Sequence, residues 1–469
     1  MNIIRKVKFA IIGAGSISFC PGTVTDILTN EGFKQADVEI HLMDIAKDAL
    51  DLSHKFCAGL AERLGRKVRV NAGTDLARAV DGADFVITAI EKDRYHYWSQ
   101  DYHIPRRYGF RQVYGENGGP GGMFHTLRNL PPMMEIAHAM EKYCPNAWML
   151  NYTNPEAKLV EAFYTLSKAK AVGICHGEKM GAYPLSRFLQ MPMERIGYKC
   201  VGLNHFGWYT QIWDKETGED LYPKLREADR NADPLAHWDE YAMMRTMFRV
   251  YGMWPYPGTN HIGEYVAWAD GLIASPNLQF YFDPLVDDPW RTRKTPEFVY
   301  SIDYNPTGRS PFPEEKKNTA EPIEAELARG EYESAFDPNK EIKGSPEYGI
   351  PIAEAIFFDK PTEFGALNIP NCGAAKDLPL GMVIECGAVA DASGIKALPC
   401  DPLPPPVAHM IATQGAIHKL VIEAYQEKSR LKLLQAVLLD PTISSYHNAV
   451  CMINELCEMQ KDVLPELNW

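Results

Sequence analysis

No stretch of this 469-residue sequence is long and apolar enough to cross a bilayer, because a spanning helix needs about 20 consecutive apolar residues. The sequence opens with a basic stretch followed by an apolar one, as a signal peptide does. However, that apolar run is only about six residues long before it meets Gly13, which is too short for a secretory signal. We therefore expect a buried first strand here, no membrane partner and a cytoplasmic location.

The sequence also has no CxxC pair and no short cysteine spacing of the kind that builds a disulfide framework. Its 10 cysteines are scattered from position 20 to position 457. This distribution is typical of free thiols in a reducing compartment.

Positive charge is in deficit: 48 Lys and Arg stand against 61 Asp and Glu, which gives a formal net charge of -13. An acidic balance argues against a nucleic-acid surface or an anionic membrane as the main partner. The charged fraction of 23% is ordinary for a soluble enzyme. We therefore expect a small-molecule partner.

Short apolar runs alternate with helical or polar stretches through the first 175 residues, and this alternation predicts a parallel sheet with crossover helices. A helix is expected where Leu52, Phe56, Leu60 and Leu64 recur every four residues. The expected strands are Val7–Ile12, Val38–Met43, Val68–Val70, Phe85–Ile90, Trp148–Leu150 and the run around Ala171. The predicted fold class is therefore α/β, with a Rossmann-type doubly wound parallel sheet.

Beyond residue 200 the pattern changes to longer, aromatic-rich segments, and the length and the hydrophobic content of 46% suffice for two cores. We predict a nucleotide-binding domain over 1–200 and a mixed α+β domain over 201–469 for substrate, metal and oligomer contacts. Residues 215–343 are polar and rich in Pro, Asp and Glu, which is typical of insertions and mobile loops. A helical tail is expected over roughly 405–460.

A glycine turn follows the first strand, in the order Gly13, Ala14, Gly15, Ser16, Ile17. Backbone amides at such a turn can meet a pyrophosphate at a helix N-terminus. The third glycine of the dinucleotide fingerprint is replaced by Ser18.

Asp44 lies 29 residues after Gly15, at the end of the second strand. There a carboxylate can accept hydrogen bonds from ribose hydroxyls and repel a 2′-phosphate, which favours NAD over NADP. We also expect Glu91 and Asn151, at the ends of later strands, to contact the cofactor. The alternative is a glycine turn in an unrelated α/β protein, with Asp44 as a helix cap.

Three polar segments follow expected strands, at the edge of an open sheet where ligands bind. They are Asn151–Glu156, Cys175–Glu178 and Gly202–Phe206. A thiolate from Cys175 and an imidazole from His205 could hold a borderline divalent cation with open positions for substrate. The alternative is that Cys175 is a buried thiol.

These motifs, taken together, resemble glycoside hydrolase family four over nearly the whole chain. Gln112 and the Leu127–Arg128 pair also resemble that family's loop over the nicotinamide. The motifs that carry the resemblance, in chain order, are the glycine turn, Asn154–Glu156, the Cys175–His176 pair, Leu203–His205, Ser345–Ile352, Asn368–Gly373 and Leu378–Glu385, with the run Gly119–Gly122.

The resemblance implies a two-domain architecture like that of lactate and malate dehydrogenases, and a reaction that depends on NAD and on manganese or another divalent metal. NAD would oxidise the sugar at C3, the C2 proton would then be removed with help from the metal, and the C1 leaving group would be eliminated. Water addition and return of the hydride would complete hydrolysis of an α-glycoside. Relatives are homodimers or homotetramers.

Residue by residue, the resemblance makes Cys175 and His205 the metal ligands and brings Asn154, Asn204 and Arg128 to the substrate. His176 occupies a position where some members carry an aspartate that assists the leaving group, unless it only orients the site.

The base that removes the C2 proton is missing from its usual place, since the aligned position is Gly258. Its neighbours Tyr256, His261 and Tyr265 are the candidates, and each could instead be a core or substrate-packing residue.

The Cys-His-Gly sequence at 175–177 resembles the branch that acts on α-glucuronides and α-galacturonides. We therefore expect an unphosphorylated sugar. A C6 carboxylate or sulfonate would need an Arg or Lys within reach; Lys179, Arg107 and Arg128 are the candidates, and each could equally be a solvated surface charge. The alternatives are an α-galactosidase, α-glucosidase or sulfoquinovosidase of the same mechanism, an NAD-dependent dehydrogenase of a small hydroxy acid or sugar, and a nucleotide sensor without catalysis.

Overall fold

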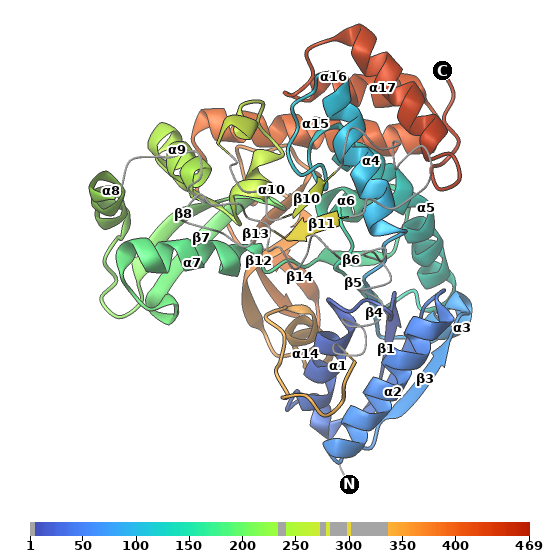
Figure 1. The fold of residues 1–469 in the computed structure, drawn as a ribbon. Helices are drawn as coiled ribbons and strands as arrows, with labels where there is room; N and C mark the ends of the chain where they lie inside the picture. Colours follow the sequence, from blue (N-terminus) through green and yellow to red (C-terminus); the bar gives the residue numbers. More distant parts are fainter. Residues whose placement is uncertain (1–4, 233–240, 273–277, 282–297, 302–335) are drawn as a thin grey trace.

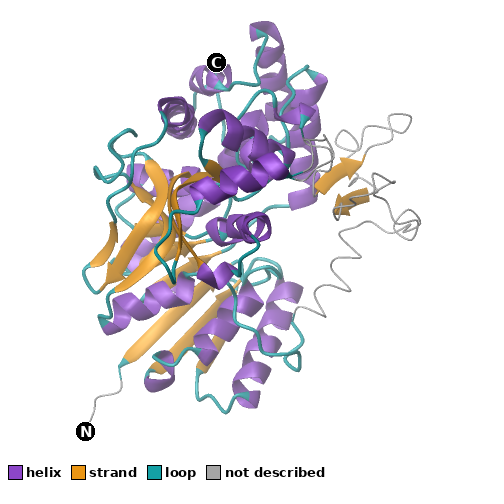
Figure 2. Ribbon diagram, turned by 90° about the vertical axis from the view of Figure 1, so that its left-hand side faces the viewer, coloured by secondary structure: helices purple, strands orange, loops and turns teal. Residues whose placement is uncertain are grey.

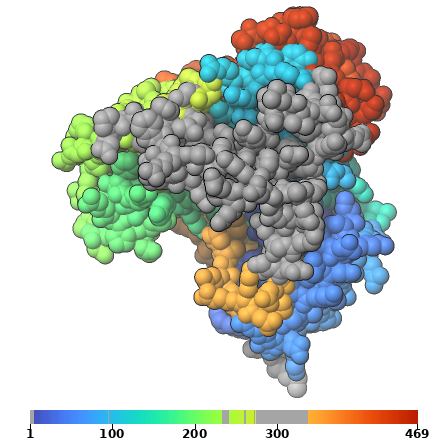
Figure 3. All heavy atoms as spheres, viewed as in Figure 1, coloured from blue at the N-terminus to red at the C-terminus, as the bar shows by residue number. Residues whose placement is uncertain are grey.

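The computed structural model describes residues 5–232, 241–272, 278–281, 298–301 and 336–469. Much of the polar stretch 215–343, for which we predicted insertions and mobile loops, lies outside the described residues. In the space-filling view of Figure 3, the N-terminal residues form the lower part of the molecule and the C-terminal helices its upper right.

A parallel half of the sheet is built by the first six strands, as the sequence predicted. Its strand order is β3-β2-β1-β4-β5-β6, and every neighbouring pair is parallel. The order reverses between β1 and β4, which is the crevice where open α/β sheets bind ligands. The strands are β1 (Lys6–Ile12), β2 (Asp37–Met43), β3 (Arg69–Gly73), β4 (Phe85–Thr88), β5 (Trp148–Asn151) and β6 (Lys170–Gly173).

Helices cover both faces of this half (Figure 2). Phe9 and Ile11 of β1 belong to one hydrophobic cluster, whereas Ala10 and Ile12 belong to the other. Alternate residues of one strand point to opposite faces, so both faces are buried. The helices are α1 (Cys20–Thr29), α2 (Lys47–Arg63), α3 (Leu76–Val80), α4 (Arg94–Arg107), α5 (Gly119–Tyr143), α6 (Glu156–Leu166) and α7 (Gly177–Leu189).

An antiparallel half extends the same sheet in the order β12-β13-β7-β8-β9, with β14 paired to β13. It joins the parallel half through one pair of residues, Asn368 of β12 opposite Gly173 of β6. Its strands are β7 (Ile196–Leu203), β8 (Phe206–Asp214), β9 (Trp254–Tyr256), β12 (Thr362–Pro370), β13 (Val383–Asp391) and β14 (Gly394–Ala397). The Rossmann-type fold class with a mixed second part is therefore confirmed, while the boundary at residue 200 stays a prediction.

The predicted helical tail is also confirmed: it consists of α15 (Pro405–Glu427), α16 (Arg430–Leu439) and α17 (Tyr446–Met459), at the top of Figure 1. In the described part of the chain, no helix is both long and apolar enough to span a bilayer. The remaining elements are α8 (Tyr222–Asn231), α9 (Ala242–Tyr251), α10 (Thr259–Gly263), α14 (Gly349–Phe358), β10 (Leu278–Tyr281), β11 (Phe298–Ser301) and the short 3-10 turns η1 (Phe33–Gln35), η2 (Met193–Arg195) and η3 (Ala269–Gly271).

Candidate active site

The glycine turn after β1 is a tight backbone cradle. Gly13 has a φ of +85°, and a Cβ added there would lie 2.2 Å from the carbonyl oxygen of Ala89, at the end of β4. A Cβ on Gly15 would lie 2.7 Å from the Cβ of Ala49. Glycine is therefore required at both positions, as at the pyrophosphate loop of a dinucleotide site.

Asp44 ties the end of β2 to this turn. One carboxylate oxygen accepts a hydrogen bond from the Gly15 amide at 2.7 Å, and the other accepts one from the Ala46 amide at 2.8 Å. The carboxylate thus lies beside the glycine turn, where a ribose would meet it. Ser16 and Ile17, the other two predicted cofactor contacts in the turn, are partly exposed.

The residues after β4 form a polar chain that leads away from the β1–β4 crevice. The ring of His125 contacts the Glu91 carboxylate at 2.8 Å through Nε2 and the Glu116 carbonyl at 2.8 Å through Nδ1. Both partners only accept hydrogen bonds, so both contacts form when the ring is protonated. Burial raises the pKa of Glu91, but the charge and hydrogen bond of His125 outweigh it and bring that pKa down to about 2.

Asn151, predicted to contact the cofactor, is fully buried at the end of β5. Its Oδ1 accepts from the Thr88 hydroxyl at 2.8 Å and the Thr153 amide at 3.0 Å, and its Nδ2 donates to the Thr153 carbonyl at 3.0 Å. These contacts give Asn151 the role of holding the loop between β5 and α6.

A buried carboxylate row crosses the seam between the two halves of the sheet. The Asn368 amide donates to Glu156 at 2.7 Å and to Glu385 at 3.0 Å. The Asn204 amide donates to the same two carboxylates at 3.2 and 3.4 Å. Asn368 faces Gly173 across the seam. A Cβ added to Gly173 would lie 2.2 Å from Glu156 Oε1. The glycine therefore makes room for the carboxylate.

The two carboxylates of this row make each other harder to ionise. Burial raises the pKa of Glu156 well above its ordinary value, and the charge of Glu385 adds to the effect. Burial also raises the pKa of Glu385. The side-chain oxygens of both Asn204 and Asn368 are buried without a hydrogen-bond partner. The row can therefore accept hydrogen bonds from a ligand's hydroxyl groups.

Cys175 lies at the edge of β6, just before α7. Its thiol accepts a hydrogen bond from the Gly177 amide at 3.3 Å. Burial raises the pKa of this thiol well above its ordinary value, and Glu156, Glu385 and Glu347 raise it further. A cation beside the thiol would act in the opposite direction, because the thiolate is the form that binds metals.

His176 pairs with Glu347, which is 171 positions away in the chain, at 2.5 Å between Nδ1 and Oε1. This hydrogen bond raises the pKa of His176 in spite of partial burial. The side chain is 35% exposed, so the imidazole is accessible to a ligand.

His205 forms the two-residue turn between β7 and β8 together with Asn204, and its φ is +63°. Such a backbone conformation is unfavourable for a residue with a Cβ and is often found at functional sites. Its Nδ1 lies 3.0 Å from Asn117 Nδ2, and its ring centroid lies 4.0 Å from that of His261. Burial lowers the pKa of both imidazoles, which favours their neutral, metal-binding form.

Glu116 joins these two imidazoles. One ligand atom from each of Glu116, His205 and His261 lies within 4.8 Å of the others. Within the described ranges of the chain, Cys175 is not part of such a group of three. Burial raises the pKa of Glu116, but the charge of Arg94, whose guanidinium lies 2.5 Å from Oε1, acts together with His205, His261 and His125 to bring that pKa down to about 2.

Two of the three candidate bases are enclosed tyrosines. Tyr256 in β9 lies against Gly207, where an added Cβ would come within 1.9 Å of its ring. The Tyr265 hydroxyl donates to the Asn204 carbonyl at 3.1 Å, and its ring stacks on Phe206 at 4.9 Å. Burial raises the pKa of both hydroxyl groups well above its ordinary value.

The three predicted partners for an anionic sugar already have protein contacts. The two terminal nitrogens of Arg128 contact Asp101 and Gln460, both at 2.9 Å. Arg107 pairs with Glu455. Lys179 lies 3.5 Å above the Tyr348 ring and also donates to the Pro346 carbonyl.

The other predicted substrate contact, Asn154, is partly exposed after β5, and its carbonyl accepts from the Asn129 amide at 2.7 Å.

Several residues of this site were not identified from the sequence: Arg94, Glu116, Asn117, Glu156, Lys158, Glu264, Glu347, Asn368 and Glu385. One available signal was a polar residue among apolar neighbours within a strand, as for Asn368 and Glu385, because polar groups are seldom buried without a partner.

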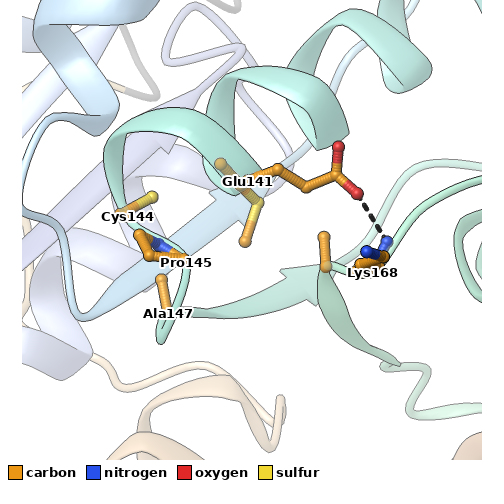
Figure 4. A pocket seen from close by; sticks show the side chains of 7 residues that line it. Glu141, Cys144, Pro145, Ala147 and Lys168 are labelled. Carbon is orange, nitrogen blue, oxygen red and sulfur yellow. Dashed lines mark hydrogen bonds between the residues drawn. The ribbon is translucent and has the colours of Figure 1, made fainter.

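A surface pocket of about 390 Å³, drawn in Figure 4, lies elsewhere. Its lining includes Cys144 and Ala147, just before β5, and Lys168 and Ala169, just before β6. These are the amino ends of the strands, whereas ligands of open α/β sheets bind at the carboxyl ends. The pocket is therefore separate from the candidate active site.

Comparison with known proteins gives two matches to family models. The model described as family 4 glycosyl hydrolase matches residues 8–191, and that of the family 4 glycosyl hydrolase C-terminal domain matches residues 200–443.

Individual relatives match over nearly the whole chain. The chain is 30% identical to an α-galactosidase of Bacillus subtilis (strain 168), over 99% of this chain and 100% of the relative. It is 28% identical to an α-glucosidase of Erwinia rhapontici, over 96% of each. A solved 6-phospho-α-glucosidase from gut microorganisms, in complex with NAD and Mn²⁺, has a similar fold, with a TM-score of 0.74, 22% identity, and coverage of 99% of this chain and 100% of that one.

Proposed function

The chain belongs to glycosyl hydrolase family 4, and from that premise we propose that it hydrolyses an α-glycoside whose sugar carries no phosphate, with NAD and a divalent cation as cofactors. NAD supplies reversible oxidation at C3 of the sugar, and the cation supplies a Lewis acid for the negative charge that then develops on sugar oxygens. The observation that carries the proposal is the convergence of Glu116 and His205 with a chain of contacts that leads, through His125 and Glu91, to the β1–β4 crevice.

The cofactor contacts come from both sides of that crevice. The glycine turn after β1 would hold the pyrophosphate, and Asp44 would accept the ribose hydroxyls. A thiol and an imidazole are suitable ligands for a borderline divalent cation, and the resemblance gives these roles to Cys175 and His205. The neutral imidazole of His205, at a strained turn and fixed by Asn117, supports its role.

His176 would donate the proton to the leaving group. Its pairing with Glu347 raises the pKa of the imidazole, which favours the protonated form, and its partial exposure gives a leaving oxygen access. The proton would pass from the ring to the glycosidic oxygen as the C1–O bond breaks, with Glu347 stabilising the charge of the ring before transfer.

Tyr265 is our candidate for the C2 base. Its hydroxyl is held by the carbonyl of Asn204, the residue next to His205, whereas Tyr256 packs beneath Gly207. Burial and the charges of Glu264 and Glu116 raise the pKa of Tyr265. A cation bound at His205 would oppose these effects and favour the phenolate.

A sugar without phosphate suits the charges around Cys175. A phosphate group carries about -1.5 to -2 charges at neutral pH and needs Arg or Lys partners. By contrast, the groups that raise the pKa of the Cys175 thiol by their charge are three carboxylates, those of Glu156, Glu385 and Glu347. Of the three cations expected from the sequence, Lys179 lies nearest to His176 in the chain, so Lys179 would meet a C6 carboxylate if the sugar is a uronide.

The test is release of the aglycone from 4-nitrophenyl α-glycosides, with and without NAD and Mn²⁺. The panel comprises glucoside, galactoside, glucuronide, galacturonide and sulfoquinovoside, each neutral sugar also as its 6-phosphate. Release that needs both cofactors, with deuterium at C2 of the sugar when the reaction runs in D₂O, supports the proposal. Activity confined to the phosphates contradicts the unphosphorylated substrate, and steady accumulation of NADH indicates a dehydrogenase instead.

A further inference from the structure

Two imidazoles and a carboxylate meet where the resemblance predicts only one metal-binding imidazole. Glu116 comes from the loop before α5, His205 from the β7–β8 turn and His261 from α10. Their ligand atoms lie within 4.8 Å of one another. Three segments that are far apart in the chain thus bring two nitrogens and one oxygen to a common point.

His261 has an unsatisfied ring nitrogen at this point. Its Nδ1 is buried and has no hydrogen-bond partner. The centroid of the His261 ring lies 4.0 Å from that of His205 and 5.1 Å from that of Tyr114. The His261 and Tyr114 rings are nearly perpendicular. A buried nitrogen without a partner costs free energy, and a bound cation would satisfy it.

The neighbours of the cluster hold its members in position. Asn117 Nδ2 lies 3.0 Å from Nδ1 of His205 and fixes the orientation of that ring. Arg94 fixes the Glu116 carboxylate at 2.5 Å. Such contacts around metal ligands orient them and keep their geometry.

The loop that carries Glu116 is anchored as well. The Glu264 carboxylate accepts hydrogen bonds from the main-chain amides of Glu116 at 2.5 Å and Asn117 at 2.9 Å. The buried Lys158 donates to the Asn117 carbonyl. Three other segments of the chain, which carry Arg94, Lys158 and Glu264, therefore maintain the position of this loop and its carboxylate.

We propose that Glu116 and His261 join His205 as protein ligands of the divalent cation. Two imidazoles and a carboxylate form a donor set that binds borderline divalent cations and leaves positions open for substrate oxygens. The inference names ligands for the metal of the proposed function, and it assigns His261, one of the three candidate bases, to the cation instead of to the C2 proton.

The test uses the full chain loaded with NAD, with Mn²⁺ as the only probe and no sugar present. Free Mn²⁺ is counted by electron paramagnetic resonance, which gives its dissociation constant. His261→Gln and Glu116→Gln are each expected to raise that constant by at least about tenfold, because even partners outside the ligand shell contribute about 10- to 100-fold. His41→Gln, which removes a buried imidazole from β2, is the matched control and should leave it unchanged.

A second measurement includes the wild type, for which the folding of the variants does not matter. Pulsed electron paramagnetic resonance of the Mn²⁺-loaded wild type should show couplings to two imidazole nitrogens, and His261→Gln should retain one. A single coupled nitrogen in the wild type, or an unchanged dissociation constant in His261→Gln, overturns the proposal. Both readouts are independent of turnover, so a failure to cleave glycosides would contradict the proposed function without affecting this result.

Discussion

The two halves of the sheet build their parts of the site from different materials. In the parallel half, the cradle at Gly13 and Gly15 is a tight backbone turn, and the residues that shape it, Asp44, Ala49 and Ala89, lie just beyond the ends of neighbouring strands. In the antiparallel half and at the seam, side chains make the site, and contacts such as His176 to Glu347 join segments 171 positions apart. The cradle in the parallel half tolerates few substitutions at its glycines, whereas the part of the site at the seam and in the antiparallel half depends on the chemistry of individual side chains.

The largest effect that would sharpen this comparison is expected at His176. His176→Gln should lower kcat by about 10²- to 10⁴-fold for an alkyl α-glycoside, because a general acid contributes that much. For a 4-nitrophenyl glycoside, whose leaving group needs little protonation, the loss should be much smaller. The two substrates are compared in steady-state kinetics, with the exposed His138→Gln as control. An equal loss on both substrates would mean that His176 does not assist departure of the leaving group.

In the parallel half, Gly13→Ala should destabilise the fold by about 2–5 kcal/mol, from a disfavoured backbone conformation and from overpacking against Ala89, and should abolish tight NAD binding. Gly82→Ala is the control, because Gly82 also has a positive φ, +64°, but nothing lies within 4 Å of an added Cβ. Denaturant unfolding and NAD titration measure the difference. If both variants bind NAD as the wild type does, the cradle does not hold the cofactor.

Glu178, in α7 near the seam, should make the stability depend on pH. Burial raises its pKa from 4.5 to about 7, so the folded chain holds a proton that the unfolded chain releases. The contribution of this group to the free energy of unfolding is fully present below the unfolded pKa of 4.5. It is lost as pH rises toward the folded pKa of about 7, and the total loss is roughly 3 kcal/mol.

Glu178→Gln keeps the uncharged form at every pH, so its free energy of unfolding should fall less than that of the wild type between pH 4.5 and pH 8. Urea unfolding at the two pH values provides the measurement, with the exposed Glu135→Gln as control. Parallel pH profiles of wild type and Glu178→Gln would show that burial does not shift this carboxyl group.

The smallest effect is expected at Asp44. Asp44→Asn retains an oxygen for the Gly15 amide but removes the negative charge, so discrimination against NADP should weaken by about tenfold, or about 1.4 kcal/mol. Titration with both cofactors measures the ratio of affinities, and Asp48→Asn, at an exposed position in the first turn of α2, is the control. An unchanged ratio would assign the cofactor preference to other residues.

The sequence predicted the parallel half well because its signals are local. Most strands from β1 to β6 contain a short apolar run, and the turn at Gly13 follows directly from β1. Periodicity predicted α2 in the same way. Nothing local, however, indicates that Glu116 meets His261, or that Asn368 faces Gly173, because long-range pairing sets these contacts.

In the candidate site, too, only residues with a local signal could be identified from the sequence. Residues at strand ends, such as Asp44, Cys175 and His205, could be identified from their positions, and their roles remain predictions. Glu385 and Asn368 stand within strands, where a polar residue is visible in the sequence but its partner is not. Glu264 and Lys158 act on the main chain of a distant loop, which leaves no trace in the pattern of residues.

The carboxylate row at the seam also bears on how this protein could be engineered for heat resistance. Glu156 and Glu385 are buried and share the side-chain amides of Asn204 and Asn368 as hydrogen-bond donors, and replacing buried ionisable groups by apolar residues of similar volume often stabilises a protein. A selection for thermal stability alone would therefore tend to remove these acids, and with them the polar row near Cys175. Thermostable variants should be screened for turnover as well, since durability gained at this row would come at the expense of catalysis.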